Sequence, residues 1–267
     1  MVAEFDQDQA AASEAEIGDA ANQTAATPQF IKIKSLLRAS HGRDLRLRDG
    51  DIIIAIDGAL NKNDIATFRA LGAKTEVLEE SLLLTICRDQ VVYDVLAEGR
   101  LGADYDYADA EASSAAAALF AEHHMEPKDH YQNYEALRDI HRHVVLYDTG
   151  YSAIATIAPP VWLLQHRAWE PMAAVLAAYA TSLVIHWGVF AATAILMAIY
   201  FHRIQFRLIR NYSLFTEHYF WHVCAARTSA EAQLICRQID PKCYFDFSYV
   251  GAPEPDSTTT PSKQQAA

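Results

Sequence analysis

The feature that most constrains this chain is a run from Pro171 to Phe201 that contains no Asp, Glu, Lys or Arg. As a single helix this run would measure roughly 46 Å, which exceeds the ~30 Å hydrocarbon core of a bilayer. The sequence His186-Trp187-Gly188 interrupts the run near its middle. The run therefore predicts membrane helices, arranged either as a hairpin of two short helices that turns at His186 or as one long tilted helix.

Basic residues flank this run on both sides, with Arg167 before it and Arg203 and Arg207 after it. Cytoplasmic flanks of membrane helices carry the excess of Lys and Arg, so both ends are expected in the cytoplasm, which favours the hairpin. Tryptophan and arginine side chains commonly lie at headgroup depth. The residues expected at the membrane interface are Trp162, Arg167, Trp169, Trp187, Arg203 and Arg207.

The segment Ser152–Leu164 before the run is apolar but short, and Pro159-Pro160 interrupts it. A bilayer crossing needs about 20 residues, so this segment is expected to dip into the membrane without crossing it. If it does cross, the N-terminal part of the chain moves to the opposite side.

Charge is unevenly distributed along the chain, whose formal net charge is −12. Residues 1–28 and 101–127 hold acidic side chains and no Lys or Arg, and the remainder is close to neutral. Nucleic-acid binding needs a basic stripe, so this class of partner is excluded. The cysteines lack CxxC spacing and fit free thiols in a reducing compartment.

Residues 30–98 alternate strand and helix signals. FIKIKSLL and DIIIAIDG have the β-prone residues of two strands, and NDIATFRALG has apolar residues at helical spacing. SLLLTICRD and QVVYDVLAEG are expected to form a hairpin. The expected order is strand, turn, strand, helix, hairpin.

That order and two motifs resemble PDZ domains. The first motif is Leu47-Arg48-Asp49-Gly50-Asp51-Ile52-Ile53 followed by Ile56-Asp57-Gly58, and the second is Leu84-Thr85-Ile86-Cys87-Arg88-Asp89-Gln90. PDZ domains bind C-terminal peptides with a glycine-containing loop and an adjacent strand edge. Here only ATPQ precedes FIKIK, without a glycine. The resemblance implies a groove between the first strand edge and the helix, formed by Phe30, Ile31, Ile33, Ile65, Phe68 and Arg69.

A second resemblance covers residues 144–235. Gly150-Tyr151-Ser152 and the segment Pro160-Val161-Trp162-Leu163-Leu164-Gln165-His166-Arg167-Ala168-Trp169 are similar to an uncharacterised bacterial membrane family that has a Pro-x-Trp-Leu-x-x-His-Arg-x-Trp segment before short membrane helices. This resemblance implies a bacterial inner (cytoplasmic) membrane protein and no particular activity.

The expected fold is an α+β, PDZ-like, partly open β-barrel domain joined to an α-helical membrane module. In chain order we expect a disordered acidic tail (1–27), the PDZ-like domain (28–102), an acidic Ala-rich linker (103–127), an amphipathic helix (128–147), the membrane module (148–250) and a disordered tail (251–267). Within the module, helices are expected near 152–165, 170–186 and 188–206, followed by a small globular part.

Histidines gather between His123 and His143, and imidazole is a common metal ligand. Their spacing fits no HExxH motif, so an exposed polar helix is favoured; the weak metal candidates are His123, His124 and His130. Phosphate loops and a GxSxG motif are also missing, so neither a cofactor nor an enzyme is expected.

Three functional hypotheses remain. The favoured one is a membrane-anchored scaffold or accessory protein whose PDZ-like module, on the cytoplasmic side, binds a membrane protein partner. The second is a small structural subunit of a larger energy-transducing or photosynthetic membrane complex, for which the alanines of the apolar run permit close helix packing. The third is a metal-dependent membrane enzyme.

Overall fold

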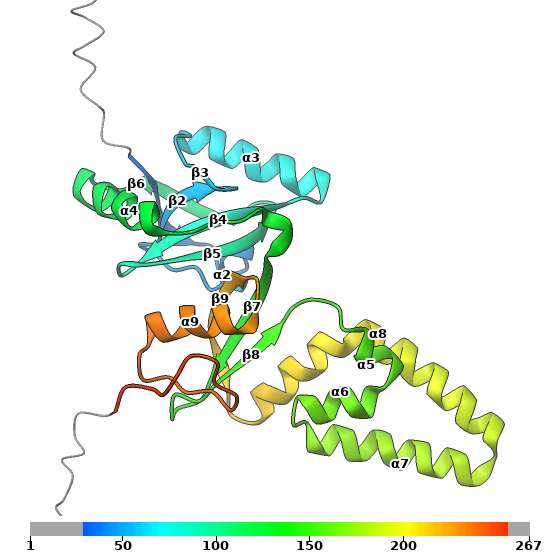
Figure 1. Cartoon of the computed structure of the whole chain (residues 1–267). Coiled ribbons are helices and arrows are strands. Elements are labelled where there is room, and N and C mark those ends of the chain that lie inside the picture. Colours follow the sequence, from blue (N-terminus) through cyan, green and yellow to red (C-terminus); the bar gives the residue numbers. More distant parts are fainter. Residues whose placement is uncertain (1–28, 256–267) are drawn as a thin grey trace, which may run out of the picture.

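The computed structural model describes residues 29–255 and combines one antiparallel sheet with a projecting group of helices (Figure 1). The strands are β1 (Ile31–Leu36), β2 (Ile52–Ile56), β3 (Ala59–Leu60), β4 (Ser81–Arg88), β5 (Val91–Glu98), β6 (Ala103–Tyr107), β7 (Gln132–Arg138), β8 (Val144–Asp148) and β9 (Tyr219–Ala226). The helices are α2 (His41–Asp44), α3 (Ile65–Leu78), α4 (Ala110–Glu122), α5 (Ala153–Ile157), α6 (Pro159–Gln165), α7 (Trp169–Ile185), α8 (Trp187–Phe215) and α9 (Ser229–Ile239). The expectations for residues 1–28 and 256–267 lie outside the described part.

The sheet has the strand order β6-β1-β2-β4-β5-β9-β7-β8, with β3 paired to β2. The α+β class is therefore as expected, but the sheet is open and continues well beyond the N-terminal domain. Two halves meet between β5 and β9, where the register has the single pair Asp94–Ala225. One hydrophobic core nevertheless runs through both halves, because Val95 and Ala97 of β5 belong to the same buried cluster as Val223 and Ile235.

The segment expected as an acidic linker is part of this fold. Its first residues form β6, which pairs with β1 along the edge of the sheet. Asp109 then caps α4 by accepting a hydrogen bond from the Ala112 amide at 2.7 Å, as N-cap aspartates do. Ala116 of α4 packs against the fully buried Phe30 and Ile54. Small alanine side chains let α4 lie close to the sheet, so this segment packs on the core instead of serving as a linker.

The expectation of an amphipathic helix over 128–147 is wrong, because a short 3-10 turn (Lys128–His130) precedes the hairpin of β7 and β8. Turn chemistry explains the difference. Asp139 Oδ1 accepts hydrogen bonds from the amides of His141 and His143, each at 2.8 Å, and Arg142 has a φ of 69°. An aspartate that binds nearby amides and a residue in the left-handed region are typical of a tight turn. The apolar residues around it fit helical spacing only by coincidence.

A buried polar cluster lies where the two halves of the sheet meet. Arg88 of β4 donates to Asp51 from Nε at 2.8 Å and from Nη2 at 2.6 Å. Arg88 Nη1 also lies 3.4 Å from Nδ1 of His222 on β9, whose ring packs edge-on against Tyr93 at 4.5 Å. Burial, and next the nearby Arg88 charge, hold the pKa of His222 well below its usual range. His222 is therefore a neutral ring inside the core.

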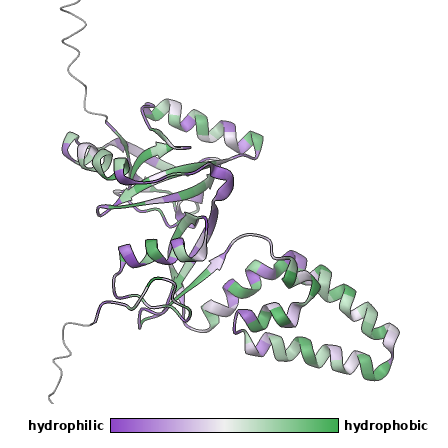
Figure 2. Cartoon of the chain, in the orientation of Figure 1, coloured by the Kyte–Doolittle hydropathy of each residue, from purple (hydrophilic) through white to green (hydrophobic). Residues whose placement is uncertain are grey.

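The helices α5 to α8 leave the sheet after β8 and return to it at β9 (Figure 1). The break between α7 and α8 is at His186, whose extended backbone caps α8 while its Nδ1 accepts from the Gly188 amide at 3.0 Å. Tyr179 of α7 and Phe190 of α8 are in ring contact at 5.7 Å, so the two helices lie side by side as a hairpin. Figure 2 shows that hydrophobic residues cover most of this pair.

Candidate functional site

A groove lies between α3 and the edge of the sheet. It contains a cavity of about 380 Å³ whose walls are mainly apolar, formed by Phe68, Leu82, Leu84, Ala97, Leu101 and Tyr105 among others. Phe68 of α3 contacts Tyr105 of β6 edge-on at 5.3 Å, and the Ile65 amide donates to the Tyr107 hydroxyl at 3.4 Å. Burial raises the pKa of Tyr105 to about 12, so its phenol stays neutral in this wall.

One long side of the groove is an unpaired strand edge. β6 pairs with β1 through residues such as Tyr105, which is opposite Ile33. No other strand of the described residues pairs with β6, because it ends the sheet order. An edge strand presents free N–H and C=O groups to any further extended segment. The groove thus has a hydrogen-bonding side as well as apolar walls.

The loop Gly99–Gly102, which leads into β6, closes one end of the groove. Gly99 and Gly102 have φ values of 67° and 65°, in the left-handed region that favours glycine. The Leu101 and Gly102 carbonyls accept hydrogen bonds from the amides of Gly42 and Leu37. In the described part of the chain, the amides of Arg100, Leu101 and Gly102 form no backbone hydrogen bond. These three amides are therefore free of backbone partners, while the Leu101 and Gly102 carbonyls are fixed.

Charged residues flank the groove at its rim. Arg69 of α3 lies over the Tyr105 ring at 5.6 Å, and its Nη2 is 3.7 Å from an Asp104 carboxylate oxygen. Arg100 pairs with Glu76 at 3.4 Å, and both of these side chains are mostly exposed. Exposed ion pairs of this kind contribute about 0–1 kcal/mol, so either arginine is readily available to an incoming anion.

The structure divides the residues predicted for the groove into two groups. Phe68 and Arg69 line the cavity, and Ile65 packs beside it on the same helix. Phe30, Ile31 and Ile33 are fully buried in the core. The expected free edge of β1 does not exist, because β1 is paired with β2 on one side and β6 on the other.

Sequence reasoning missed the residues that replace that edge, namely the loop Gly99–Gly102 and β6. Two signals were present: a pair of glycines directly after a predicted strand, and the alternation of Ala103-Asp104-Tyr105-Asp106-Tyr107. The PDZ resemblance placed the glycine loop directly before Phe30, where the sequence ATPQ has no glycine. The sheet order instead brings the last strand of the N-terminal half back beside the first.

The residues expected at a membrane interface also separate. Trp162 is 5% exposed and packs against His166 and Phe201, so its placement at an interface is wrong. Trp169 and Trp187 are 54% and 73% exposed. They begin α7 and α8, at opposite ends of the helical pair.

The basic residues of this expectation are all exposed. Arg203 and Arg207 are on the half of α8 that approaches the sheet. Arg167 Nη1 forms an ion pair with Asp246 at 2.8 Å. Arg167 is therefore bound to the C-terminal part of the chain as well as being available to solvent.

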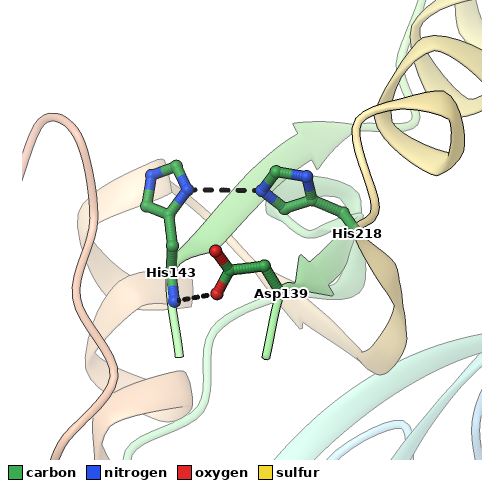
Figure 3. A group of neighbouring side chains, drawn as sticks. All are labelled: Asp139, His143 and His218. Atoms are coloured by element: carbon green, nitrogen blue, oxygen red, sulfur yellow. Dashed lines mark hydrogen bonds between the residues drawn. The ribbon is translucent and has the colours of Figure 1, made fainter. Parts of the chain in front are cut away.

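The weak metal candidates are not brought together. His123 Nε2 lies 2.9 Å from a buried Asp94 carboxylate oxygen, and His130 Nδ1 lies 3.0 Å from Glu126. His124 belongs to no group of metal-ligating side chains in residues 29–255. The structure instead gathers Asp139, His143 and His218 (Figure 3).

Comparison with known protein families and curated sequences gives no match from which a role for these sites could be inferred. No protein-family model matches the chain, and no curated protein sequence matches it either. Both resemblances noted in the sequence therefore remain predictions. The functional interpretation depends on the groove, the helical pair and the histidine group themselves.

Proposed function

We propose that this chain is a membrane-anchored docking protein whose PDZ-like groove binds the C-terminal end of a partner membrane protein. The observation that carries this proposal is the combination found at α3 and β6: an apolar cavity, an unpaired strand edge and a loop with free amides. Each of the three supplies a different part of peptide recognition. The proposal assigns no catalytic step to the groove.

In this mode, an extended peptide adds to the outer edge of β6 as a further strand, and its backbone bonds supply affinity. The last side chain of the peptide enters the cavity between Phe68 and Leu101, which favours an apolar residue there. The terminal carboxylate accepts hydrogen bonds from the amides of Arg100, Leu101 and Gly102. Convergent backbone amides are an established way to bind an anion, and the Arg69 charge adds to their attraction.

The helical pair supports anchoring in a bilayer. By length and composition, α8 could cross a membrane. Only 11% of the apolar 18-residue stretch of α8 that would do so is buried inside the protein. Trp169 and Trp187 are separated by the length of α7, roughly 27 Å at 1.5 Å per residue, which is close to the thickness of a hydrocarbon core. Tryptophans at both interfaces would bracket α7. We place the pair in a bacterial inner membrane, with the sheet on the cytoplasmic side where Arg203 and Arg207 lie.

The groove is tested with the full chain in detergent and a set of labelled peptides that differ in their last residue. Each peptide is offered with a free and with an amidated C-terminus, and binding is followed by fluorescence anisotropy. We expect peptides with an apolar last residue and a free carboxylate to bind. Amidation should weaken them at least tenfold, because the loop amides then lose their charged acceptor.

Two variants of α3 connect this binding to the cavity. Ala73→Leu adds volume to the cavity wall and should abolish binding, whereas Lys74→Leu, on an exposed position of the same helix, should leave it intact. Equal binding of free and amidated peptides would rule out carboxylate recognition. Unchanged binding by Ala73→Leu would place the peptide elsewhere.

Sidedness is tested by cysteine labelling on intact cells with a membrane-impermeant thiol reagent. The four native cysteines are buried, so the unaltered chain serves as the blank. Cysteines introduced at the exposed positions Lys74, Trp187 and Pro253 report on the sheet, the tip of the helical pair and the C-terminal segment. We expect labelling at 187 alone. Labelling at 74 would place the groove outside the cytoplasm, and an unlabelled 187 would contradict the hairpin crossing.

A second candidate function is a structural subunit of a larger membrane complex. It is favoured by small exposed side chains on both helices of the pair, which permit a neighbouring helix to approach closely: Ala173, Ala174, Ala177, Ala180 and Ala192. Native electrophoresis after mild solubilisation separates the two functions. A stable large complex that survives Ala73→Leu supports the subunit, and a complex lost in that variant supports docking through the groove.

A further inference from the structure

Three side chains from two distant parts of the chain meet beside the sheet. Asp139 and His143 belong to the turn between β7 and β8, and His218 follows the end of α8 (Figure 3). Their ligand atoms all lie within 4.8 Å of one another, and all three residues are partly buried. His143 Nδ1 and His218 Nε2 face each other at 3.2 Å.

The outer nitrogens of both rings have partners that accept hydrogen bonds. His218 Nδ1 lies 3.0 Å from the Thr216 carbonyl oxygen, which can only accept, so Nδ1 carries the proton. His143 Nε2 lies 3.2 Å from an Asp246 carboxylate oxygen, within ion-pair distance although not aligned as a hydrogen bond. This carboxylate favours a proton on Nε2. Each neutral ring then directs a lone pair at the other, and either a proton or a metal ion between the two nitrogens would remove this repulsion.

The spacing suits a metal ion in that position. Tetrahedral Zn²⁺ binds imidazole nitrogen at about 2.0–2.1 Å, which places two such nitrogens about 3.3 Å apart. Asp139 offers a third donor, a carboxylate oxygen within 4.8 Å of both nitrogens. Its Oδ1 already accepts from two turn amides, so the carboxylate is fixed before a ligand arrives, and Oδ2 is free of hydrogen bonds in the described part of the chain.

A supporting shell surrounds the three donors. Asp246, behind His143, is itself bound by Arg167 at 2.8 Å, and Tyr244 stacks on the His143 ring at 5.1 Å. Carboxylates and carbonyls that hold the far nitrogen of a histidine are typical of metal sites, where they fix the ring and its tautomer. His143 and His218 also line a cavity of about 660 Å³ between the helices and the C-terminal loop. A fourth ligand position would open into that cavity.

We propose that Asp139, His143 Nδ1 and His218 Nε2 bind one Zn²⁺ ion, with the remaining position open to water or an exogenous ligand. Nitrogen and oxygen donors of this kind suit Zn²⁺ and related first-row ions. The site is separate from the α3–β6 groove and does not depend on peptide binding there. It joins the turn of β7 and β8 to the end of α8, so a bound ion would clamp the helical group to the sheet.

The test uses the full chain in detergent, freed of any purification tag and stripped with a chelator. Zn²⁺ is titrated by calorimetry, and the bound metal is counted after dialysis. The unaltered chain should bind one Zn²⁺ with a raised Tm, because an ion that binds only the folded state stabilises it. His218→Gln should lose this binding, and Asp246→Asn should weaken it about 10- to 100-fold.

Two further variants keep the test decisive. Asp139→Asn preserves an oxygen that accepts from the turn amides but removes the charged ligand, so it should fold and fail to retain Zn²⁺. His141→Gln, an exposed histidine in the same turn, should bind as the unaltered chain does. Circular dichroism of the metal-free variants checks their folding. Less than one Zn²⁺ per unaltered chain, or undiminished binding by folded His218→Gln and Asp139→Asn, would overturn the proposal.

Discussion

The strand-rich half and the helical pair place the same kinds of side chain in opposite surroundings. Ile33, Ile53 and Ile86 of the sheet are 0% exposed, whereas Ile195 and Leu196 of α8 are 62% and 67% exposed. In water, a continuous exposed apolar surface on this scale is unfavourable. The difference indicates that the sheet buries its apolar side chains in its own core. The helical pair leaves them exposed and is suited to apolar surroundings outside the chain.

Charged groups reinforce this contrast. The sheet buries Arg88 and Asp51, and it can do so because the two ions neutralise each other through two hydrogen bonds. Between Pro171 and Phe201 the helical pair has no charged side chain that would need such a partner. The sheet therefore accommodates a buried charge by placing an opposite charge beside it. The apolar part of the helical pair instead contains no charged side chain.

The largest expected effect is on stability, when Arg88 loses its buried partner Asp51. Asp51→Ala leaves the Arg88 charge unpaired in the core and should lower the free energy of unfolding by about 3–5 kcal/mol. Hydrogen exchange of the β2 and β4 amides, measured by mass spectrometry on the solubilised chain, reports this change. Glu76→Ala, which removes the exposed partner of Arg100, should change the free energy of unfolding by less than about 1 kcal/mol. Similar effects of the two variants would contradict the contrast between buried and exposed pairs.

A charge on the outward face of the helical pair comes next in size. Leu196→Asp should oppose membrane insertion by about 2.5–3.5 kcal/mol, the cost of an aspartate at the centre of a membrane helix. The matched control is Leu37→Asp, because Leu37 is exposed to nearly the same extent, 63% against 67%. Membrane and soluble fractions are compared by immunoblotting. If both variants stay fully membrane-bound, the outward face of α8 does not contact lipid.

A smaller, pH-dependent effect should arise from His222. The pKa of His222 in the folded chain is well below its usual value of 6.5, so in mildly acidic solution the unfolded chain binds more protons than the folded one. Stability should consequently fall as pH drops below 6.5, by up to about 1.4 kcal/mol per pH unit from this group. His222→Gln keeps a hydrogen-bond acceptor near Arg88 and should show a shallower decline of Tm between pH 7 and pH 5. Equal slopes would show that His222 titrates normally.

Local signals predicted much of the fold. The β-prone runs gave β1, β2, β4 and β5, and the helical break is at His186 as the sequence His186-Trp187-Gly188 indicated. The Asn63–Leu71 pattern gave only the first half of α3, which continues to Leu78. These elements depend on neighbouring residues, whose spacing and turn preferences are visible in the sequence. The helix expected over 128–147 was wrong because a single turn at Asp139 outweighed an apparent apolar period.

Long-range pairing could not be predicted in the same way. The groove depends on β6 returning to β1, and the histidine group joins positions 75 residues apart, His143 and His218. Neither contact leaves a local pattern, since each is fixed by the packing of the whole sheet. The burial of Trp162 likewise depends on Phe201, which lies in α8, beyond the whole of α7 in the chain.

The position of β9 in the chain has a consequence for biogenesis. β9 lies between β5 and β7, yet it is synthesised after α5 to α8. Until the ribosome has produced the whole helical group, β5 and β7 each keep an open edge, which is the kind of surface that promotes aggregation. The sheet can therefore be completed only after the helices have been synthesised. A nascent chain that stalls after β8 and before β9 would be a substrate for chaperones.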